Sequence, residues 1–359
     1  YKIISLCPYY LKLSFSSLVE SDHGDVSQYY NKYRKFPHYS LSIDDNSESL
    51  NAYVKVLQGN EKSNKRIKLR NYLYKQCSSI GCHDKKFHVL DATVGSGKTL
   101  SGLAAALRIC KVNNCKRIYN IIPLTNIISQ TVQVYKKALG VNDLYVSEIH
   151  SKCEFSSSWL RMYSSRWNSP ITVSTGVTFI ESLLGCRPGM TKKLCNFCDS
   201  VFILDEFHML TFQKYDLWKP ILGWFIFMSK FLNCHFIFSS GTPIRFWEEY
   251  DLSLDCNDII PTNEYLKMSE YEMNRVKINE MSEIDDVNFL IDSIEKKSRY
   301  GSVLSVFNTI KNSVVVYKAI KDKFPNKCVY YMSSMLTPID REEILIEINK
   351  NLANGVKVI

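Results

Sequence analysis

The chain has 359 residues, of which 45% are hydrophobic, and its formal net charge is +9 at pH 7. This length allows two or three domains, and the apolar content excludes a disordered chain. The charge suits a polyanionic partner as well as an ordinary lysine-rich surface. The most apolar window, residues 217–232, is interrupted by Lys219 and Lys230. It is too short to cross a bilayer, so we expect a buried helix there and no membrane partner.

Twelve cysteines without a recognisable secretory signal indicate reduced thiols and a cytoplasmic location. Structural zinc usually needs four ligands. The chain has one CxxC pair, Cys195 and Cys198, with no second pair to complete it, and a looser group of Cys77, Cys82 and His83. Zinc binding by the cysteines is therefore the less favoured interpretation.

Residues 1–35 are predicted to be the end of a larger helical domain. Apolar residues recur at helical spacing over residues 11–19 and lead to Asp22 and Asp25. A helix with an apolar face needs a neighbour, and the chain begins with Tyr1 rather than Met, so we expect a domain body before it. Asp22 or Asp25 is a candidate metal ligand, although a capping or solvated aspartate is more common.

Residues 36–60 are polar and broken, which indicates a linker with room for one short helix. Residues 61–83 are expected to carry a basic helix whose apolar residues lie near one face. Those residues are Ile67, Leu69, Tyr72, Leu73 and Cys77. This helix leads into a short apolar strand at residues 87–90.

The stretch ATVGSGKT, residues 92–99, lies between that strand and an Ala-rich helix over residues 100–110. A helix N-terminus directs N–H groups and positive dipole charge at an anion. Lys98 can reach the β- and γ-phosphates, and the Thr99 hydroxyl can ligate Mg²⁺. The pattern predicts a loop that binds the phosphates of ATP, although Ala92 stands where the strict pattern has glycine. The expected nucleotide-binding residues are Gly95, Ser96, Gly97, Lys98 and Thr99.

The second half of the predicted site follows the apolar run at residues 200–204, which is typical of a buried parallel strand. It delivers Asp205, Glu206 and His208 at its carboxyl end, where ligands bind in such sheets. Asp205 is suited to hold Mg²⁺, and Glu206 to polarise the attacking water. A solvated acidic turn is the plainer alternative, which the order relative to residues 92–99 disfavours.

Strands and helices alternate through this region, which predicts an α/β fold with a parallel sheet wrapped by helices. Further strands are expected at residues 117–123, 171–176 and 235–238. Thr125 and Thr175 follow two of them, where hydroxyls and helix N-termini can contact a phosphate backbone. Ordinary helix capping is the alternative.

A polar stretch, residues 251–283, separates this sheet from a second βα pattern. Strands are expected at residues 302–307 and 328–332, helices at 309–324 and 340–352, and a further strand begins at 356. We therefore expect one lobe at residues 61–255 and a partial second lobe at residues 256–359.

The order of residues 92–99, 205–208 and 240–242 resembles superfamily-two helicase cores, in which a phosphate loop, a DExH box and a Ser-Ala-Thr-like motif follow one another. Over nearly its whole length the chain resembles the type I CRISPR-associated helicase–nuclease. Residues 13–25 resemble the tail of that family's HD nuclease domain. The other segments that carry the likeness are Leu69-Arg70, residues 117–123 with Thr125 and Gln130, Thr175 with residues 179–183, and residues 307–309 and 333–341.

The resemblance implies a RecA-like doubly wound sheet in one complete lobe, a truncated second lobe and an α-helical remnant of an HD domain. It also implies ATP-driven translocation on single-stranded DNA, cutting by a metal-dependent HD nuclease, and recruitment by an RNA-guided CRISPR surveillance complex. Asp22 matches the last metal-binding aspartate of the HD site, which would take Mn, Ni, Co or Fe. We expect a monomer.

The resemblance also assigns roles to single residues. Lys98 and Thr99 would bind phosphate and Mg²⁺, Asp205 would hold the metal, Glu206 would position water, and Arg70 would join the nucleotide site. The expected coupling residues are His208, Ser240, Gly241 and Thr242. The expected nucleic-acid contacts are Thr125, Thr175, Asn308 and Thr309.

The chain ends at Ile359, before the family's later helicase motifs and the arginine that reaches the γ-phosphate, so we expect weak ATP binding and poor hydrolysis by this piece alone. Two rival functions stay open. One is a DExH helicase that acts on RNA or in a restriction complex. The other is a non-catalytic docking subunit with a relic ATP site, which the intact Lys98, Asp205 and Glu206 argue against.

Overall fold

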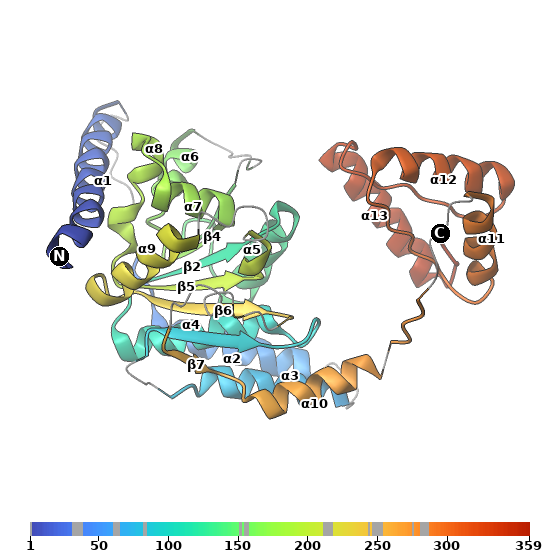
Figure 1. Ribbon diagram of the computed structural model, residues 1–359, viewed down its shortest axis with the longest axis horizontal. Helices are drawn as coiled ribbons and strands as arrows, with labels where there is room; N and C mark the ends of the chain where they lie inside the picture. Colours follow the sequence, from blue (N-terminus) through green and yellow to red (C-terminus); the bar gives the residue numbers. More distant parts are fainter. Residues whose placement is uncertain are drawn as a thin grey trace. The chain divides into compact units, whose positions relative to one another are not determined.

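The computed structural model describes residues 2–30, 39–59, 65–81, 85–150, 153, 158–210, 218–242, 245, 254–274, 276–280 and 287–359. Cys82 and His83 lie outside these ranges. The chain divides into two compact units, Tyr1–Val276 and Lys277–Ile359 (Figure 1).

The first unit is built on a seven-stranded sheet in the order β3-β4-β2-β5-β6-β1-β7, and every strand pair is parallel. The strands are β1 Phe87–Asp91, β2 Arg117–Ile122, β3 Val146–Ile149, β4 Ile171–Thr175, β5 Ser200–Asp205, β6 His235–Ser240 and β7 Cys256–Asp258. The helices are α1 Lys2–Tyr30, α2 Ile43–Gly59, α3 Lys65–Ser78, α4 Lys98–Asn113, α5 Thr125–Leu139, α6 Ser158–Ser165, α7 Gly176–Leu184, α8 Pro188–Thr191, α9 Trp218–Phe231 and α10 Thr262–Met273. Short 3-10 turns cover Leu194–Phe197 and Phe207–Leu210.

Alternation along the strands divides the core between the two faces of the sheet. On β5, Val201 and Ile203 join the cluster under α2–α5, while Phe202 and Leu204 join the aromatic cluster under α7 and α9. Figure 1 shows helices on both faces. The predicted doubly wound parallel α/β fold is confirmed, as is the buried helix at residues 217–232, which is α9. Among the described residues, no helix combines the length and apolar character needed to cross a membrane.

The predicted linker at residues 36–60 is wrong, because α2 is a core helix. Leu50 is 0% exposed and Val54 is buried beside it. The two side chains are four residues apart and therefore share one helix face, which packs on α4 and α5. The many Ser, Asp and Asn residues that suggested a linker occupy the other faces, apart from Asn46, which donates to the Tyr145 hydroxyl at 2.6 Å.

Leu50→Ala is expected to lower the free energy of unfolding by about 2–5 kcal/mol, because it leaves a cavity between packed helices. Leu57→Ala, on the same helix but 41% exposed, is the matched control and should cost far less. Chemical denaturation of both variants measures the difference. Equal costs would mean that α2 is peripheral.

The first unit extends past the predicted boundary at residues 255/256. β7 pairs with β1, from Phe87↔Cys256 onward, and α10 follows it with Met268 buried in the main core. β7 has three residues and no apolar run, so it could not be recognised from the sequence and was assigned to the second lobe. β3 was also missed, because its four residues, Val146–Ile149, have two polar residues in the middle instead of an apolar run.

The second unit has the two predicted helices, as α12 Ile310–Lys323 and α13 Pro338–Ala353, and a further one that was not predicted, α11 Val287–Ser298. The predicted strands there are only partly formed. Val303 N donates to Val358 O at 2.9 Å, and Tyr330 N donates to Ile359 O at 2.9 Å. The single bridge found among the described residues of this unit, Cys328↔Val358, is parallel. The last segment thus lies between the two earlier ones, as in the start of a parallel sheet.

Two histidines are buried side by side inside the first unit. His88 of β1 and His235 of β6 stack with ring centroids 6.2 Å apart, and Lys86 Nζ lies 3.0 Å from His235 Nε2. Burial, the Lys86 charge and His88 lower the pKa of His235 to about 3. His235 is therefore neutral in the folded protein throughout the physiological range.

This shift predicts acid sensitivity. An unfolded histidine titrates near pH 6.5, so the unfolded state binds the proton first and stability is lost as pH falls from about 6.5 toward 3. At pH 5 we expect His235 to account for a loss of about 2 kcal/mol relative to pH 7.5. The measurement is the free energy of unfolding at both pH values. His235→Gln should flatten the difference, whereas His23→Gln, at an exposed position, should keep it; an unchanged difference in His235→Gln would contradict the assignment.

Candidate nucleotide-binding site

The loop between β1 and α4 is wound so tightly that two positions require glycine. Gly95 has φ 78° and Gly97 has φ 90°, which is the left-handed region that side chains disfavour. A Cβ on Gly95 would also displace the end of the Arg66 side chain. Ser96 closes the turn, because its hydroxyl donates to Thr93 O at 2.6 Å. The loop delivers Lys98 as the first residue of α4.

The acidic pair lies at the same edge of the sheet as this loop. Asp205 ends β5, and β6 separates β5 from β1, so the carboxyl ends of all three strands are neighbours. Lys98 Nζ contacts Glu206 Oε1 at 2.8 Å, with the side chains 14% and 27% exposed respectively. Residues 108 positions apart in the sequence therefore form one ion pair.

The end of β6 and the residue after it hold both carboxylates. Ser239 Oγ donates to Asp205 Oδ1 at 3.0 Å. Ser240 Oγ donates to Glu206 Oε2 at 2.8 Å, and Gly241 N donates to Glu206 Oε1 at 2.9 Å. His208 Nδ1 lies 3.4 Å from Ser240 Oγ and 3.6 Å from Glu206 Oε2. Three of the four expected coupling residues thus surround the Glu206 carboxylate.

Thr242 follows Gly241 in the turn at residues 240–242, and within this group of residues its backbone contacts only Ser240. Its N–H donates to Ser240 Oγ at 3.1 Å, and its carbonyl accepts from that hydroxyl at 2.7 Å. The Ser240 hydroxyl is therefore shared between the turn and Glu206.

The surroundings shift the pKa values of the two carboxylates in opposite directions. Burial raises the pKa of Asp205, against the opposing effect of Lys98 and Ser239. Burial also acts to raise the pKa of Glu206, but the hydrogen bond and charge of Lys98, with Ser240 and Gly241, outweigh it and leave this pKa lowered. Glu206 also has φ 44°, a costly conformation for a non-glycine residue that is concentrated at functional sites.

Other predicted residues lie around this centre. Arg70 of α3 donates from Nε to Gly95 O at 3.2 Å, so it supports the loop. Thr99 follows Lys98 on α4 and is exposed.

Thr175 has a structural use: its buried side chain accepts from Thr178 N at 3.2 Å and caps α7. The capping alternative therefore accounts for its hydroxyl. Thr125 begins α5 and is half-buried.

The remaining predicted residues lie elsewhere. Asn308 and Thr309 are exposed in the second unit, where Thr309 caps α12. Asp22 is exposed on α1 and belongs to no cluster of potential metal ligands among the described residues. Cys195 and Cys198 likewise form no such cluster within the described ranges.

Sequence reasoning missed two residues of the site. Asp91 ends β1 and has its pKa raised to about 6 by burial, with Arg245, 3.9 Å away, opposing the shift. Its position directly before the loop could have revealed it. Tyr265 of α10 donates to Gly241 O at 3.1 Å, and no sequence signal pointed to it.

The arrangement fits the triphosphate of a nucleotide with its magnesium ion. Lys98 already pairs with an anionic oxygen, at the N-terminus of a 16-residue helix. The space is tight, because a Cβ on Gly241 would lie 3.2 Å from Lys98 Nζ and 3.3 Å from Glu206 Oε1. Asp205 and Thr99 offer the hard oxygen ligands that Mg²⁺ prefers.

Comparison with known proteins supports this interpretation. The CRISPR-associated nuclease/helicase Cas3 of Methanocaldococcus jannaschii is 24% identical over 354 residues, which cover 90% of this chain and 44% of that protein. The predicted resemblance to the CRISPR-associated helicase–nuclease is thereby confirmed as a similarity. The chain spans less than half the length of this relative.

Solved structures show the same fold. T. fusca Cas3 with AMPPNP has a TM-score of 0.59 at 13% identity, over 87% of this chain and 41% of that one. The helicase MrfA bound to DNA has a TM-score of 0.56 at 14% identity, over 90% and 45%. S. cerevisiae Dbp5 bound to RNA and ADP BeF3 has a TM-score of 0.53 at 14% identity, over 88% and 72%. The RecA-like character of the fold is thus confirmed.

A family model described as type III restriction enzyme, res subunit, matches residues 44–245. This match begins within α2, which agrees with the place of that helix in the core. It also includes the phosphate loop, the acidic pair and the turn at residues 240–242. Because the model covers more than half of the chain, the protein belongs to this family of helicase-type ATPases.

Proposed function

We propose that the protein is an ATP-dependent translocase and helicase on single-stranded DNA, coupled to an HD nuclease in type I CRISPR antiviral defence. The observation that carries the motor part is the Lys98–Glu206 ion pair at the carboxyl edge of the sheet. The similarity to Cas3 supports the CRISPR part.

In this proposal Lys98 exchanges partners. Before nucleotide binds, its ammonium neutralises Glu206; afterwards it turns to the β- and γ-phosphates. Glu206 then loses the interaction that lowers its pKa most and becomes a better acceptor for a proton of the attacking water. Mg²⁺, held by Thr99 and Asp205, would neutralise charge that develops on the phosphates.

Coupling would run through the turn at residues 240–242. Ser240 and Gly241 both bind the Glu206 carboxylate, and Tyr265 holds the Gly241 carbonyl. A change in the charge that Glu206 faces would therefore alter the hydrogen bonds between Glu206 and this turn. His208 lies beside the same hydroxyl, so it would share the coupling role.

In the first unit the DNA path is proposed for the carboxyl edge of the sheet near Thr125 and the N-terminus of α7, where Thr175 lies. In the second unit Asn308 and Thr309 are proposed as nucleic-acid contacts. Phosphate contacts of this kind do not read sequence. Asp22 is proposed as one ligand of an HD nuclease metal, Mn, Ni, Co or Fe. The RNA-guided surveillance complex is the proposed partner, and the chain is proposed to be monomeric.

The test compares single-stranded DNA and RNA of identical sequence. Fluorescence anisotropy measures their binding to the 359-residue chain with AMPPNP, with ADP and without nucleotide, and ATP hydrolysis is followed in parallel. The proposal expects tighter DNA binding that changes with nucleotide state. Preference for RNA would favour a DExH helicase of another kind, as the likeness to RNA-bound Dbp5 would allow. Binding indifferent to nucleotide would favour a docking subunit.

A further inference from the structure

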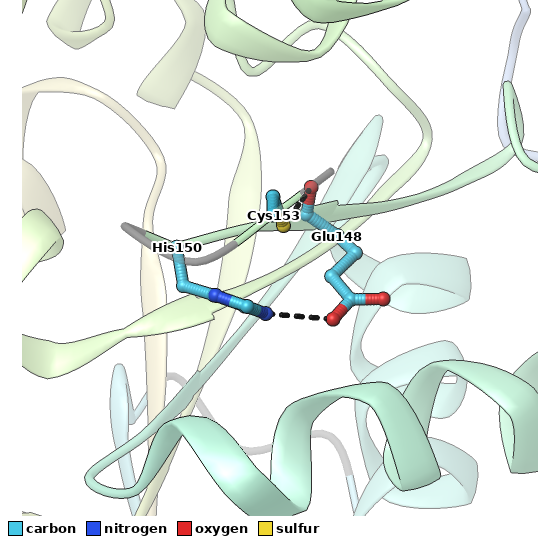
Figure 2. A group of neighbouring side chains, drawn as sticks. All are labelled: Glu148, His150 and Cys153. Atoms are coloured by element: carbon cyan, nitrogen blue, oxygen red, sulfur yellow. Dashed lines mark hydrogen bonds and ion pairs between the residues drawn. The ribbon is translucent and has the colours of Figure 1, made fainter. Parts of the chain in front are cut away.

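Three different metal-ligating side chains converge at the end of β3, away from the residues assigned to nucleotide binding. Figure 2 shows Glu148, His150 and Cys153 around one point. Glu148 and His150 are two residues apart at the end of a strand, so they project from the same side. Cys153 lies three residues further along the chain, and its N–H donates to His150 O at 3.1 Å.

The ligand atoms are close enough to share one ion. The carboxylate oxygen, the imidazole nitrogen and the sulfur all lie within 4.8 Å of one another. His150 Nε2 is 2.7 Å from Glu148 Oε1, and the side chains are 7% and 26% exposed. Within the described part of the chain, this is the one group of three or more His, Cys, Asp or Glu residues that meets this criterion.

Surrounding contacts hold the group in place. Ser129 of α5 donates to Glu148 Oε1 at 2.5 Å, which orients the carboxylate as an outer-shell partner does in metal sites. Cys153 Sγ donates to Glu148 O at 3.4 Å. Ser174 of β4 donates to Ile149 O at 2.7 Å and anchors the strand between the ligands.

The set of donors distinguishes between metals. Mg²⁺ and Ca²⁺ prefer oxygen ligands throughout, whereas one thiolate, one imidazole and one carboxylate suit Zn²⁺. A plain His–Glu ion pair would explain the 2.7 Å contact, and the bond from the thiol to Glu148 O would explain the place of the sulfur. A zinc site is favoured because it explains why all three kinds of donor atom lie within 4.8 Å of one another.

We propose that Glu148, His150 and Cys153 bind one Zn²⁺ ion, with a water molecule in the fourth position. On binding, the Cys153 thiol proton passes to solvent, His150 ligates through Nε2 with its proton on Nδ1, and Glu148 ligates as the carboxylate. The ion would tie the end of β3 to α5 through Ser129. This site is independent of the proposed motor function.

The test uses the metal-free 359-residue chain with Co²⁺ as a spectroscopic probe and Zn²⁺ as competitor, in excess Mg²⁺. We expect one equivalent of Co²⁺ to give a thiolate-to-metal absorption band that Zn²⁺ removes. Cys153→Ser should abolish the band, and His150→Gln should weaken Zn²⁺ binding by roughly 10- to 100-fold or more. Circular dichroism checks that each variant folds.

Matched controls come from other thiols and carboxylates. Cys186→Ser, at an exposed position, and Asp205→Asn should leave the band unchanged. The proposal is overturned if the folded wild-type chain gives no thiolate band, because that result needs no variant. It is equally overturned if the band survives Cys153→Ser and disappears in the double variant Cys195→Ser, Cys198→Ser.

Discussion

Glu206→Gln is expected to reduce the rate of ATP hydrolysis by roughly 10²- to 10⁴-fold, the usual contribution of a positioned general base, while ATP still binds. Gln keeps one oxygen, which can accept from Gly241 N in place of Oε1, while its amide NH₂ can donate to Ser240 Oγ, whose own proton can go to Thr242 O. The substitution removes the negatively charged oxygen that would accept a proton from the attacking water. Loss of turnover with retained binding is the signature of that role.

The measurement is the hydrolysis rate beside the Kd of a fluorescent ATP analogue, both in saturating Mg²⁺. Glu181→Gln, at an exposed position on α7, is the matched control and should match the wild type. The water-positioning role of Glu206 would be wrong if hydrolysis survived the substitution. Equal loss of binding and turnover would instead assign Glu206 to holding the loop.

The central strands β5 and β6 could be predicted because each carries an unbroken apolar run, at residues 201–204 and 236–238. Both strands are buried on both faces of the sheet, and such strands appear in a sequence as continuous apolar runs rather than as alternating ones. The edge strands gave no such signal, since β7 has three residues, one of them exposed. α2 was misread for a different reason: a helix needs only a narrow apolar face, and Leu50 and Val54 supply it among polar neighbours.

Motif order predicted which residues meet, but not how they bond. Lys98 and Glu206 were expected at one edge of the sheet, and the ion pair places them there. The role of Tyr265 depends on α10 returning to the site, which local sequence does not encode. For Thr175 the sequence left helix capping and a nucleic-acid contact open; the structure shows the cap, because a hydroxyl after a strand can bond the helix that follows it, and the nucleic-acid contact stays a prediction.

Lys98→Ala is the variant expected to affect nucleotide binding most. The ammonium supplies a charged hydrogen bond to phosphate, worth about 1.5–3 kcal/mol, so the Kd for MgATP should rise roughly 10- to 150-fold. The same substitution removes the ammonium partner of Glu206 and leaves that carboxylate beside the hydroxyl of Ser240, the N–H of Gly241 and the imidazole of His208. The pKa of Glu206 should rise in consequence, because burial is then less opposed.

Lys116→Ala provides a matched control for this substitution. Lys116 also pairs with a carboxylate, that of Asp199 at 2.8 Å, but directly before β2 and β5, at the amino edge of the sheet. Losing that pair should leave the Kd unchanged. Titration with a fluorescent ATP analogue measures all three proteins. If Lys98→Ala bound MgATP as tightly as the wild type, the loop would not hold the phosphates. The ion pair would then be structural and the motor proposal would fail with it.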